Sequence, residues 1–292
     1  MTEPYLARLA RRTAEAGTVL CVGIDPTEAM LPDGWPTGLP GIERFARLVV
    51  EAAAPYAAAI KPNLAFFEAW GSAGAAALER VVAATPSGVL VIADAKRGDV
   101  ETTVARQAVA LYDALGADAV TVSPYLGLGA LGAFLEREGR FAYVLCRTSN
   151  PGAGELQDLV VAADAATGAP AEPLHRRVAR RVADAGLGDR AGLVVGATAP
   201  AELAAIRDLV PGLAFLVPGV GAQGGDAAAA LAAGRAVAGP AGAEIGGGLL
   251  VNVSRGIAGA AAGPDPGTAG GGPAERIAAA ARRWSSTLAV LS

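Results

Sequence analysis

The sequence predicts a single (β/α)8 TIM barrel over its 292 residues, and three observations point to that fold class. Eight short apolar runs of strand length recur along the chain, helix-like segments lie between them, and the runs are continuously apolar instead of alternating. Continuous apolar runs are typical of parallel strands that are covered on both faces, and barrels of this kind commonly form one domain of about 250 residues. A doubly wound open sheet is the alternative that the same alternation allows.

The predicted strands contain many β-branched Val and Ile residues, which favours strand over buried helix. The eight expected strands are Val19–Ile24, Ala57–Ile60, Val89–Ala93, Ala119–Val122, Ala142–Cys146, Gly192–Gly196, Leu213–Val217 and Leu249–Val253. The expected helices are Gly41–Ala54, Glu68–Ala84, Val100–Leu115, Gly129–Glu138, Pro173–Ala185, Ala201–Leu209, Asp226–Ala238 and Pro273–Leu291.

Two segments depart from this alternation. Residues 148–172 make a long connection after the fifth strand, and connections of that length usually serve as a lid or a binding loop. Residues 258–273 are rich in Gly, Ala and Pro and have little capacity to pack, so we expect a mobile surface loop there.

Composition excludes several classes of function. The chain has 24 Lys and Arg against 28 Asp and Glu, which argues against broad binding of nucleic acid or of an anionic membrane. No secretory signal or membrane-spanning run is expected. Cys21 and Cys146 both lie in apolar runs, and we expect two reduced thiols in a cytoplasmic protein.

The inventory of side chains also limits the chemistry. His175 is the single histidine, and we expect it in the first turn of a surface helix. Histidine triads and His-rich metal sites are therefore excluded. Lys, Asp, Glu, Ser, Thr, Arg or backbone groups must carry any reaction.

The end of the third predicted strand concentrates charge in the spacing D-x-K-x-x-D. Asp94, Lys96 and Asp99 follow the apolar run Val91–Ala93. Charged side chains are rarely buried unless they are paired, so two carboxylates around one ammonium group suggest a preorganised network with coupled pKa values. An ion-paired turn of purely structural value is the alternative that this pattern leaves open.

Other predicted strands also end in polar residues, and in such barrels the active site lies at the carboxyl ends of the strands. Any one of them could be a cap or turn residue, but together they predict a site at one face of the barrel. They are Asp25, Lys61, Ser123, Ser149, Ser254 and Arg255.

The loop after the seventh predicted strand is rich in glycine and leads into a predicted helix. Gly221 and Gly224 belong to this loop, Pro218–Asp226, where backbone N–H groups and a helix start favour an anion. Barrels commonly bind phosphate between the loops after strands seven and eight, and Arg255 lies on the second of these. The pattern predicts a phosphorylated substrate.

At this point the sequence resembles the orotidine 5′-phosphate decarboxylase family, and the motifs span most of the chain. The longer bacterial subgroup of that family has a similar insertion, which begins here at Cys146. The matching segments are Val22–Pro26, Ile60–Asn63, Ala65–Glu68, Asp94–Asp99, Pro218–Val220, Gln223–Asp226 and Val253–Ile257.

The resemblance implies a role for individual residues. Lys96 would protonate C6 of the pyrimidine as carbon dioxide leaves, with Asp94 beside the substrate carboxylate. Asp99 and Thr103 would reach the site of a neighbouring subunit in a homodimer and contact the ribose hydroxyls. The remaining substrate contacts would come from Asp25 and Lys61 at the ribose, Ser149 at the pyrimidine, and Gln223 and Arg255 at the 5′-phosphate.

The resemblance further implies that no metal or organic cofactor is needed. The nearest rival is a sugar-phosphate decarboxylase or synthase of the same superfamily, which shares the D-x-K-x-x-D spacing but uses magnesium. A magnesium site would favour an additional acidic residue near the end of the second strand, where this chain carries Lys61. A non-catalytic barrel that binds a nucleotide as a sensor is a further alternative.

Overall fold

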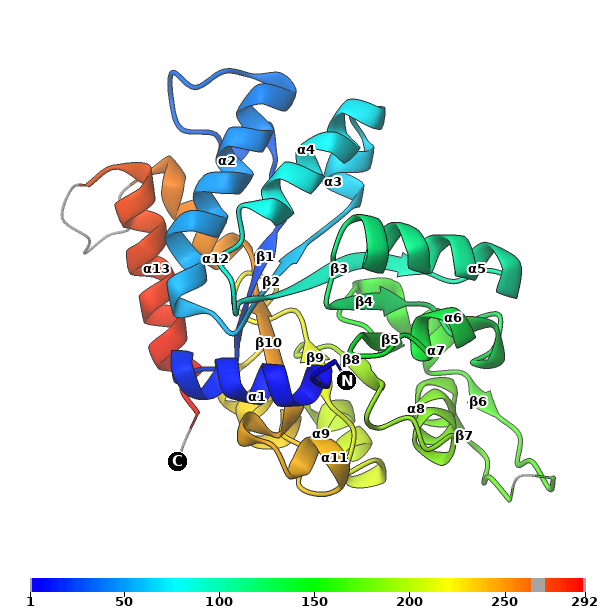
Figure 1. Ribbon diagram of the computed structural model, residues 1–292. Coiled ribbons are helices and arrows are strands. Elements are labelled where there is room, and N and C mark those ends of the chain that lie inside the picture. The colour runs from blue at the N-terminus through cyan, green and yellow to red at the C-terminus, as the bar shows by residue number, and fades with distance from the viewer. Residues whose placement is uncertain (1, 167, 264–270, 291–292) are drawn as a thin grey trace.

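A closed barrel of eight parallel strands forms the centre of the computed structural model, which describes residues 2–166, 168–263 and 271–290 (Figure 1). Neighbours around the barrel follow the chain order, and the last strand pairs with the first. The predicted barrel is confirmed, and the open sheet is wrong. The strands are β1 Leu20–Ile24, β2 Ala59–Pro62, β3 Leu90–Arg97, β4 Ala119–Val122, β5 Phe141–Arg147, β8 Ala191–Val195, β9 Phe215–Val217 and β10 Leu250–Val253.

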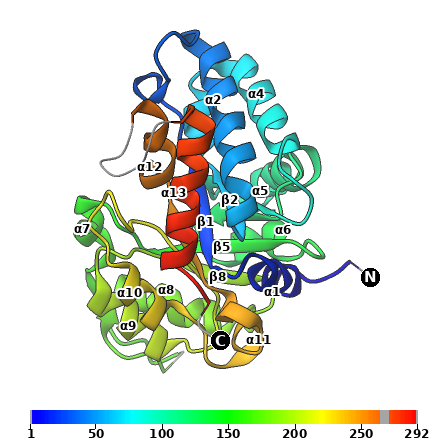
Figure 2. The same cartoon turned by 90° about the vertical axis from the view of Figure 1, so that its left-hand side faces the viewer.

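Helices surround the barrel on its outer face (Figures 1 and 2). The α-helices of eight or more residues are α1 Tyr5–Ala16, α2 Gly38–Ala53, α4 Gly71–Ala83, α5 Glu101–Ala108, α8 Leu174–Asp184, α9 Pro200–Leu209, α10 Ala227–Gly234 and α13 Pro273–Thr287. The short ones are α3 Ala65–Glu68, α6 Gly132–Leu135, α7 Gly154–Gln157, α11 Gly239–Gly242 and α12 Arg255–Ala258. Single turns occupy Glu28–Met30, Ala54–Tyr56, Gly129–Leu131, Pro151–Ala153, Ile245–Gly248 and Gly259–Ala262, and a π-helical turn spans Val109–Ala114.

The barrel strands bury both faces, which explains why their sequences do not alternate between polar and apolar residues. One set of side chains packs inside the barrel and the other packs against the surrounding helices. In β1, for example, Cys21 belongs to the first set, whereas Leu20 and Val22 belong to the second. Cys21 and Cys146 are free and buried, and burial raises the pKa of each thiol to about 12.

Helix α1 was not predicted, and it packs across the amino-terminal end of the barrel (Figure 1). The Tyr5 ring stacks on Phe141 at the start of β5, with 4.7 Å between ring centroids. Tyr5, Leu6 and Leu9 are buried among residues of the barrel interior. Because these side chains fill the amino-terminal end, a cavity can open only toward the opposite end of the barrel.

The connection after β5 contains structure of its own. Helix α7 is followed by the antiparallel pair β6 Val160–Val161 and β7 Glu172–Pro173. Helix α8 then begins at Leu174, and His175 lies in its first turn as predicted. The prediction of a surface position is wrong for the His175 side chain, which is buried beneath this insertion.

The first part of residues 258–273, for which the sequence predicts a mobile surface loop, contains helical turns. Ala258 ends α12, and the turn Gly259–Ala262 packs against α13. The Arg276 guanidinium of α13 donates hydrogen bonds to the carbonyls of Ala260 and Ala261, so this glycine- and alanine-rich stretch is fastened through its backbone. Residues 264–270 lie outside the described part of the chain.

Within the described ranges, no helix is both long and apolar enough to cross a membrane.

Candidate active site

A cavity of about 500 Å³ opens at the carboxyl ends of the barrel strands. Residues in or directly after all eight barrel strands meet there, although these strands are far apart in sequence. This is the face at which the sequence predicts a site. The cavity brings together most of the predicted site residues, namely Asp25, Lys61, Asp94, Lys96, Ser149, Gln223, Ser254 and Arg255.

The wall of this cavity carries a row of alternating charges. The Asp94 carboxylate accepts a hydrogen bond from Lys61 Nζ at 2.5 Å and another from Lys96 Nζ at 2.5 Å. Lys61 is 4% exposed, whereas the Lys96 side chain is 52% exposed and reaches into the open part of the cavity. Asp94 is thus held between one buried and one accessible ammonium group.

Each charge of this row favours the ionised form of its neighbours. Burial by itself raises the pKa of the Asp94 carboxyl, but the ammonium groups of Lys61 and Lys96 outweigh burial and hold that pKa well below its usual range. Burial lowers the pKa of Lys61, but Asp94 and Asp25 outweigh it and keep the Lys61 pKa above its usual value. Asp94 and Lys61 are therefore ionised at neutral pH.

An irregularity of β3 presents Asp94 and Lys96 to the cavity. Ala93 pairs with Val120 and Arg97 pairs with Val122. The step from the first pair to the second therefore covers four residues in β3 but only two in β4. Such bulges redirect side chains and are common beside active sites. Lys96 has φ +48°, the one left-handed non-glycine residue among the described residues. That conformation is strained for a lysine, and the surrounding structure must hold it.

The Thr121 hydroxyl holds this strained turn in place. It accepts hydrogen bonds from the backbone N–H groups of Ala95 and Lys96, each at 3.0 Å, and donates one to Asp94 Oδ1 at 3.1 Å. One donor and two acceptor positions are all that a hydroxyl has, so the group is fully used. Thr121 thereby fixes both the backbone of Lys96 and the carboxylate beside it.

Three buried polar atoms on the cavity wall have no hydrogen-bond partner within the described residues. They belong to Asp25, Asn252 and Ser254. Buried polar atoms are nearly always hydrogen-bonded, and exceptions call for an explanation. Their shared position on one cavity leaves hydrogen-bonding capacity there for a polar ligand.

The loops after β5 and β9 meet across the cavity. Ser149 Oγ donates a hydrogen bond to Gln223 Oε1 at 3.0 Å. Gly219 lies against Ser149 with φ +97°, and a side chain there would come within 3.0 Å of the serine Cβ. This close approach requires glycine and allows the two loops to touch.

The predicted glycines of the β9 loop have a different place from the one expected. Gly221 borders a neighbouring cavity and packs against Trp284, while Gly224 lines neither of these cavities. The N–H of Gly224 donates to the Gly221 carbonyl at 2.8 Å, so it serves the turn itself. Gln223 and Arg255 are the side chains that the two loops present to the cavity.

Three more predicted residues, besides Gly221 and Gly224, lie outside the cavity of this chain. Asp99 accepts a hydrogen bond from the Val100 N–H at 2.7 Å at the start of α5, and Thr103 lies in the first turn of that helix. Ser123 follows β4, where its N–H donates to the Arg97 carbonyl. None of the three lines the cavity formed by the described residues.

Sequence reasoning missed several residues of the cavity wall. Thr121 and Asn252 lie inside strands, and the signal that could have found them is a polar side chain in an otherwise apolar run. Thr148, Asn150 and Gln157 belong to the connection after β5. Among the described residues, no group of three or more His, Cys, Asp or Glu side chains is arranged to bind a metal ion.

Comparison with known proteins agrees with this geometry. Residues 18–269 match the model of the orotidine 5′-phosphate decarboxylase / HUMPS family. An orotidine 5′-phosphate decarboxylase of Herpetosiphon aurantiacus is 44% identical over 241 residues, which are 82% of this chain and 84% of that protein. One from Halorubrum lacusprofundi is 46% identical over 255 residues, 87% of each chain.

Solved structures give the same result. The Leishmania donovani OMP decarboxylase has a TM-score of 0.79 at 35% identity, with 98% of each chain covered. A putative orotidine 5′-phosphate decarboxylase from Streptomyces avermitilis has a TM-score of 0.79 at 35% identity, with 99% of this chain and 96% of that chain covered. Since the matches extend over most of the sequence and over the cavity-lining strands, the chain belongs to the orotidine 5′-phosphate decarboxylase / HUMPS family.

Proposed function

We propose that this chain decarboxylates orotidine 5′-monophosphate to uridine 5′-monophosphate and carbon dioxide, without a metal or an organic cofactor. The observation that carries the proposal is the row Lys61–Asp94–Lys96 on the wall of the cavity. Family membership and the names of the relatives support the same reaction.

The charge row meets the chief difficulty of this reaction. Loss of carbon dioxide from C6 leaves an electron pair on a ring carbon that has no adjacent electron sink. The Lys96 ammonium is already fixed by Asp94 and by the strained backbone turn, so it stabilises the developing carbanion with little reorganisation. Lys96 then donates its proton to C6, and Asp94 lies beside the departing carboxylate.

The rest of the cavity accommodates the nucleotide. Arg255 and Gln223 bind the 5′-phosphate, Ser149 faces the pyrimidine, and Asp25 and Lys61 lie at the ribose. The unpartnered oxygen of Asp25 supports this, because a ribose hydroxyl would satisfy it. Binding of the remote phosphate supplies energy for closing the loops after β5 and β9 over the ring.

The active form in this proposal is a cytoplasmic homodimer in which Asp99 and Thr103 complete the site of the neighbouring chain and contact its ribose. Both residues lie outside the cavity of their own chain. Exposed apolar side chains flank α5, with Val100 directly before its start and Val109 directly after its end, and Tyr125 and Leu126 are exposed after β4. Such side chains favour burial against a second copy. Two free buried thiols fit a reducing compartment.

An assay with added chelator tests the proposed reaction. Purified protein should remove the absorbance of orotidine 5′-monophosphate at the same rate with and without EDTA. A chelator-sensitive reaction, or turnover of a sugar phosphate in its place, would assign the chain to the magnesium-dependent branch of the family. Lys61, at the strand end where that branch would need an acidic side chain, favours the nucleotide reaction.

Mixing two inactive variants tests the dimer. Lys96→Ala and Asp99→Ala subunits should each be inactive alone, and a mixed dimer should regain one working site, because one chain contributes Lys96 and the other Asp99. Random mixing in equal amounts should restore about a quarter of the wild-type activity. If mixed dimers form and remain inactive, Asp99 serves its own chain.

A further inference from the structure

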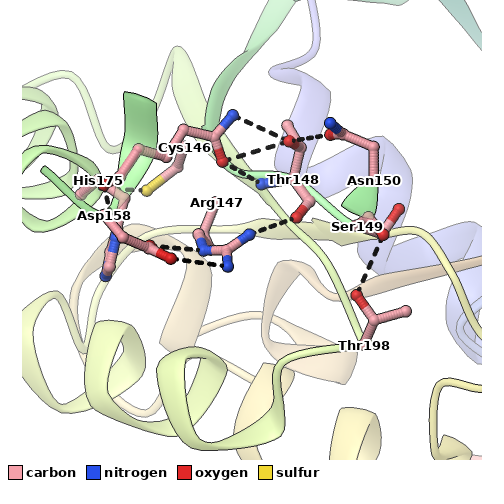
Figure 3. A network of polar contacts seen from close by, with 9 residues as sticks. Cys146, Arg147, Thr148, Ser149, Asn150, Asp158, His175 and Thr198 are labelled. Atoms are coloured by element: carbon pink, nitrogen blue, oxygen red, sulfur yellow. Dashed lines mark hydrogen bonds and ion pairs between the residues drawn. The ribbon is translucent and has the colours of Figure 1, made fainter. Parts of the chain in front are cut away.

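The three residues that follow β5, Thr148–Asn150, line the cavity and are fastened by the insertion behind them (Figure 3). Figure 3 shows Asp158 and His175 on one side of this segment and Thr198, which follows β8, on the other. Thr198 Oγ1 donates to the Ser149 carbonyl at 3.3 Å. The segment that carries Ser149 is thus held from two directions.

Gln157, the last residue of α7, provides the closest attachment to this segment. Its Oε1 accepts the backbone N–H of Thr148 at 2.9 Å and lies 3.2 Å from the Thr148 hydroxyl. Its Nε2 donates to the same hydroxyl at 2.9 Å. Because a backbone N–H needs an acceptor, the orientation of the amide is set by Thr148. The Gln157 amide therefore binds both the backbone and the side chain of Thr148.

Hydrogen bonds and an ion pair hold the insertion, and with it Gln157, in a fixed position. Asp158 makes a two-pronged ion pair with Arg147, at 2.9 and 3.0 Å, and Arg147 donates to the Thr148 carbonyl at 3.0 Å. His175 Nδ1 lies 3.0 Å from the Gln157 carbonyl, which can only accept, so the ring nitrogen carries the proton of that bond. Cys146 Sγ donates to the His175 carbonyl at 3.1 Å.

We propose that Gln157 is a positioning residue that holds the Thr148–Ser149 peptide in the orientation needed to bind the pyrimidine. The inference rests on the proposed function, in which Ser149 faces the ring. Gln157 lines the cavity, but its Oε1 and one of its N–H groups are committed to Thr148. Its action on the substrate therefore passes through Thr148.

The geometry at the end of β5 explains why the Thr148 backbone needs a side-chain partner. β5 ends at Arg147, and a register shift against β8 occurs between Leu145 and Arg147. The N–H of Thr148 therefore has its partner in the Gln157 side chain. A displacement of about 1 Å at a substrate-binding group can cost about 100-fold in rate.

Gln157→Ala tests the inference through a split between two ligands. The variant should bind uridine 5′-monophosphate about tenfold more weakly by calorimetry, while ribose 5-phosphate, which lacks the pyrimidine, should bind within about twofold of wild type. Its kcat/KM for orotidine 5′-monophosphate should fall by about 10- to 100-fold. Gln157→Asn keeps the amide but is one methylene shorter, so it should show the same losses in a chain that still folds.

Leu156→Ala is the matched control, because it alters the neighbouring residue of α7 without touching Thr148, and its kcat/KM should stay within about twofold of wild type. A double-mutant cycle of Gln157→Ala with Thr148→Ala should be non-additive if both act through one contact. Equal weakening of both ligands, unchanged binding of uridine 5′-monophosphate, or additive effects would each overturn the inference. Lack of turnover by the unaltered chain would instead count against the proposed function, since the calorimetric split requires no turnover.

Discussion

The carboxylates of Asp94, largely shielded, and of Glu172, buried, are each held by two cations, and they differ in what surrounds them. Asp94 lies between Lys61 and Lys96 on the cavity wall. Glu172, in the insertion after β5, lies between Arg177 and Arg180, at 2.9 and 3.1 Å. In both clusters the cations outweigh the effect of burial and lower the pKa of the carboxyl.

In the Glu172 cluster, no buried polar side-chain atom lacks a hydrogen-bond partner within the described residues. A further N–H group of Arg177 donates to the carbonyls of Ala162 and Pro170, so the guanidinium joins β7 to the preceding segment of the insertion. The Asp94 cluster is not complete, because the oxygen of neighbouring Asp25 has no partner within the described residues and Lys96 is half exposed. We infer that the same charge arrangement serves structure where every buried polar atom has a partner, and chemistry where binding capacity remains.

The largest expected effect is on turnover, through Lys96. Lys96→Ala should reduce kcat by at least about 10⁴-fold, because it removes both the proton donor and the charge that stabilises the carbanion. Binding of uridine 5′-monophosphate should remain measurable by calorimetry. Turnover near the wild-type rate would place the Asp94 cluster in the same structural class as that of Glu172.

A smaller effect is expected from Thr121, which holds Asp94 and the Lys96 backbone. Thr121→Val keeps the shape but leaves two N–H groups without their acceptor, and kcat should fall about tenfold, as expected for a misplaced catalytic group. Thr121→Ser keeps the hydroxyl and is the matched control, with kcat within about threefold of wild type. Equal activity of the Val and Ser variants would show that the hydroxyl does not hold the turn.

The smallest effect on activity is expected from Glu172. Glu172→Gln should leave kcat within about twofold of wild type and reduce the free energy of unfolding by about 2 kcal/mol at pH 7. Because the folded-state pKa of Glu172 lies below its unfolded value of about 4.3, its stabilisation is present above that pH and is lost as pH falls through the folded pKa. Urea unfolding of both proteins should therefore converge at low pH, and a constant difference would contradict this.

Much of the fold could be predicted because each barrel strand is a short apolar run and the chain order around the barrel follows the sequence. Helix α1 was missed, although Tyr5, Leu6 and Leu9 have helical spacing, because it precedes the first strand and does not belong to the alternation. The pair β6–β7 gave no local signal, since Val160 pairs with Pro173 across a long connection.

The charged part of the site could be predicted because Lys61, Asp94 and Lys96 each follow an apolar run, and parallel strands bring such ends together. The residues that hold these charged side chains in position could not be predicted. Thr121 is marked in the sequence only as a polar residue in an apolar run, which does not reveal what it holds, and the strain at Lys96 becomes visible only in the backbone. Gln157 reaches Thr148 only because the four-residue helix α7 turns the chain back, and so short a helix has no readable periodicity.

The free energy of unfolding of Lys96→Ala, measured with urea beside that of Glu172→Gln, tests the central distinction most directly. If the Asp94 cluster is built for chemistry, removal of the half-exposed lysine should leave stability within about 0.5 kcal/mol of wild type, or above it, while activity is lost. A loss of about 2 kcal/mol or more, equal to that of Glu172→Gln, would contradict the account, because Lys96 would then stabilise the fold as the arginines around Glu172 do.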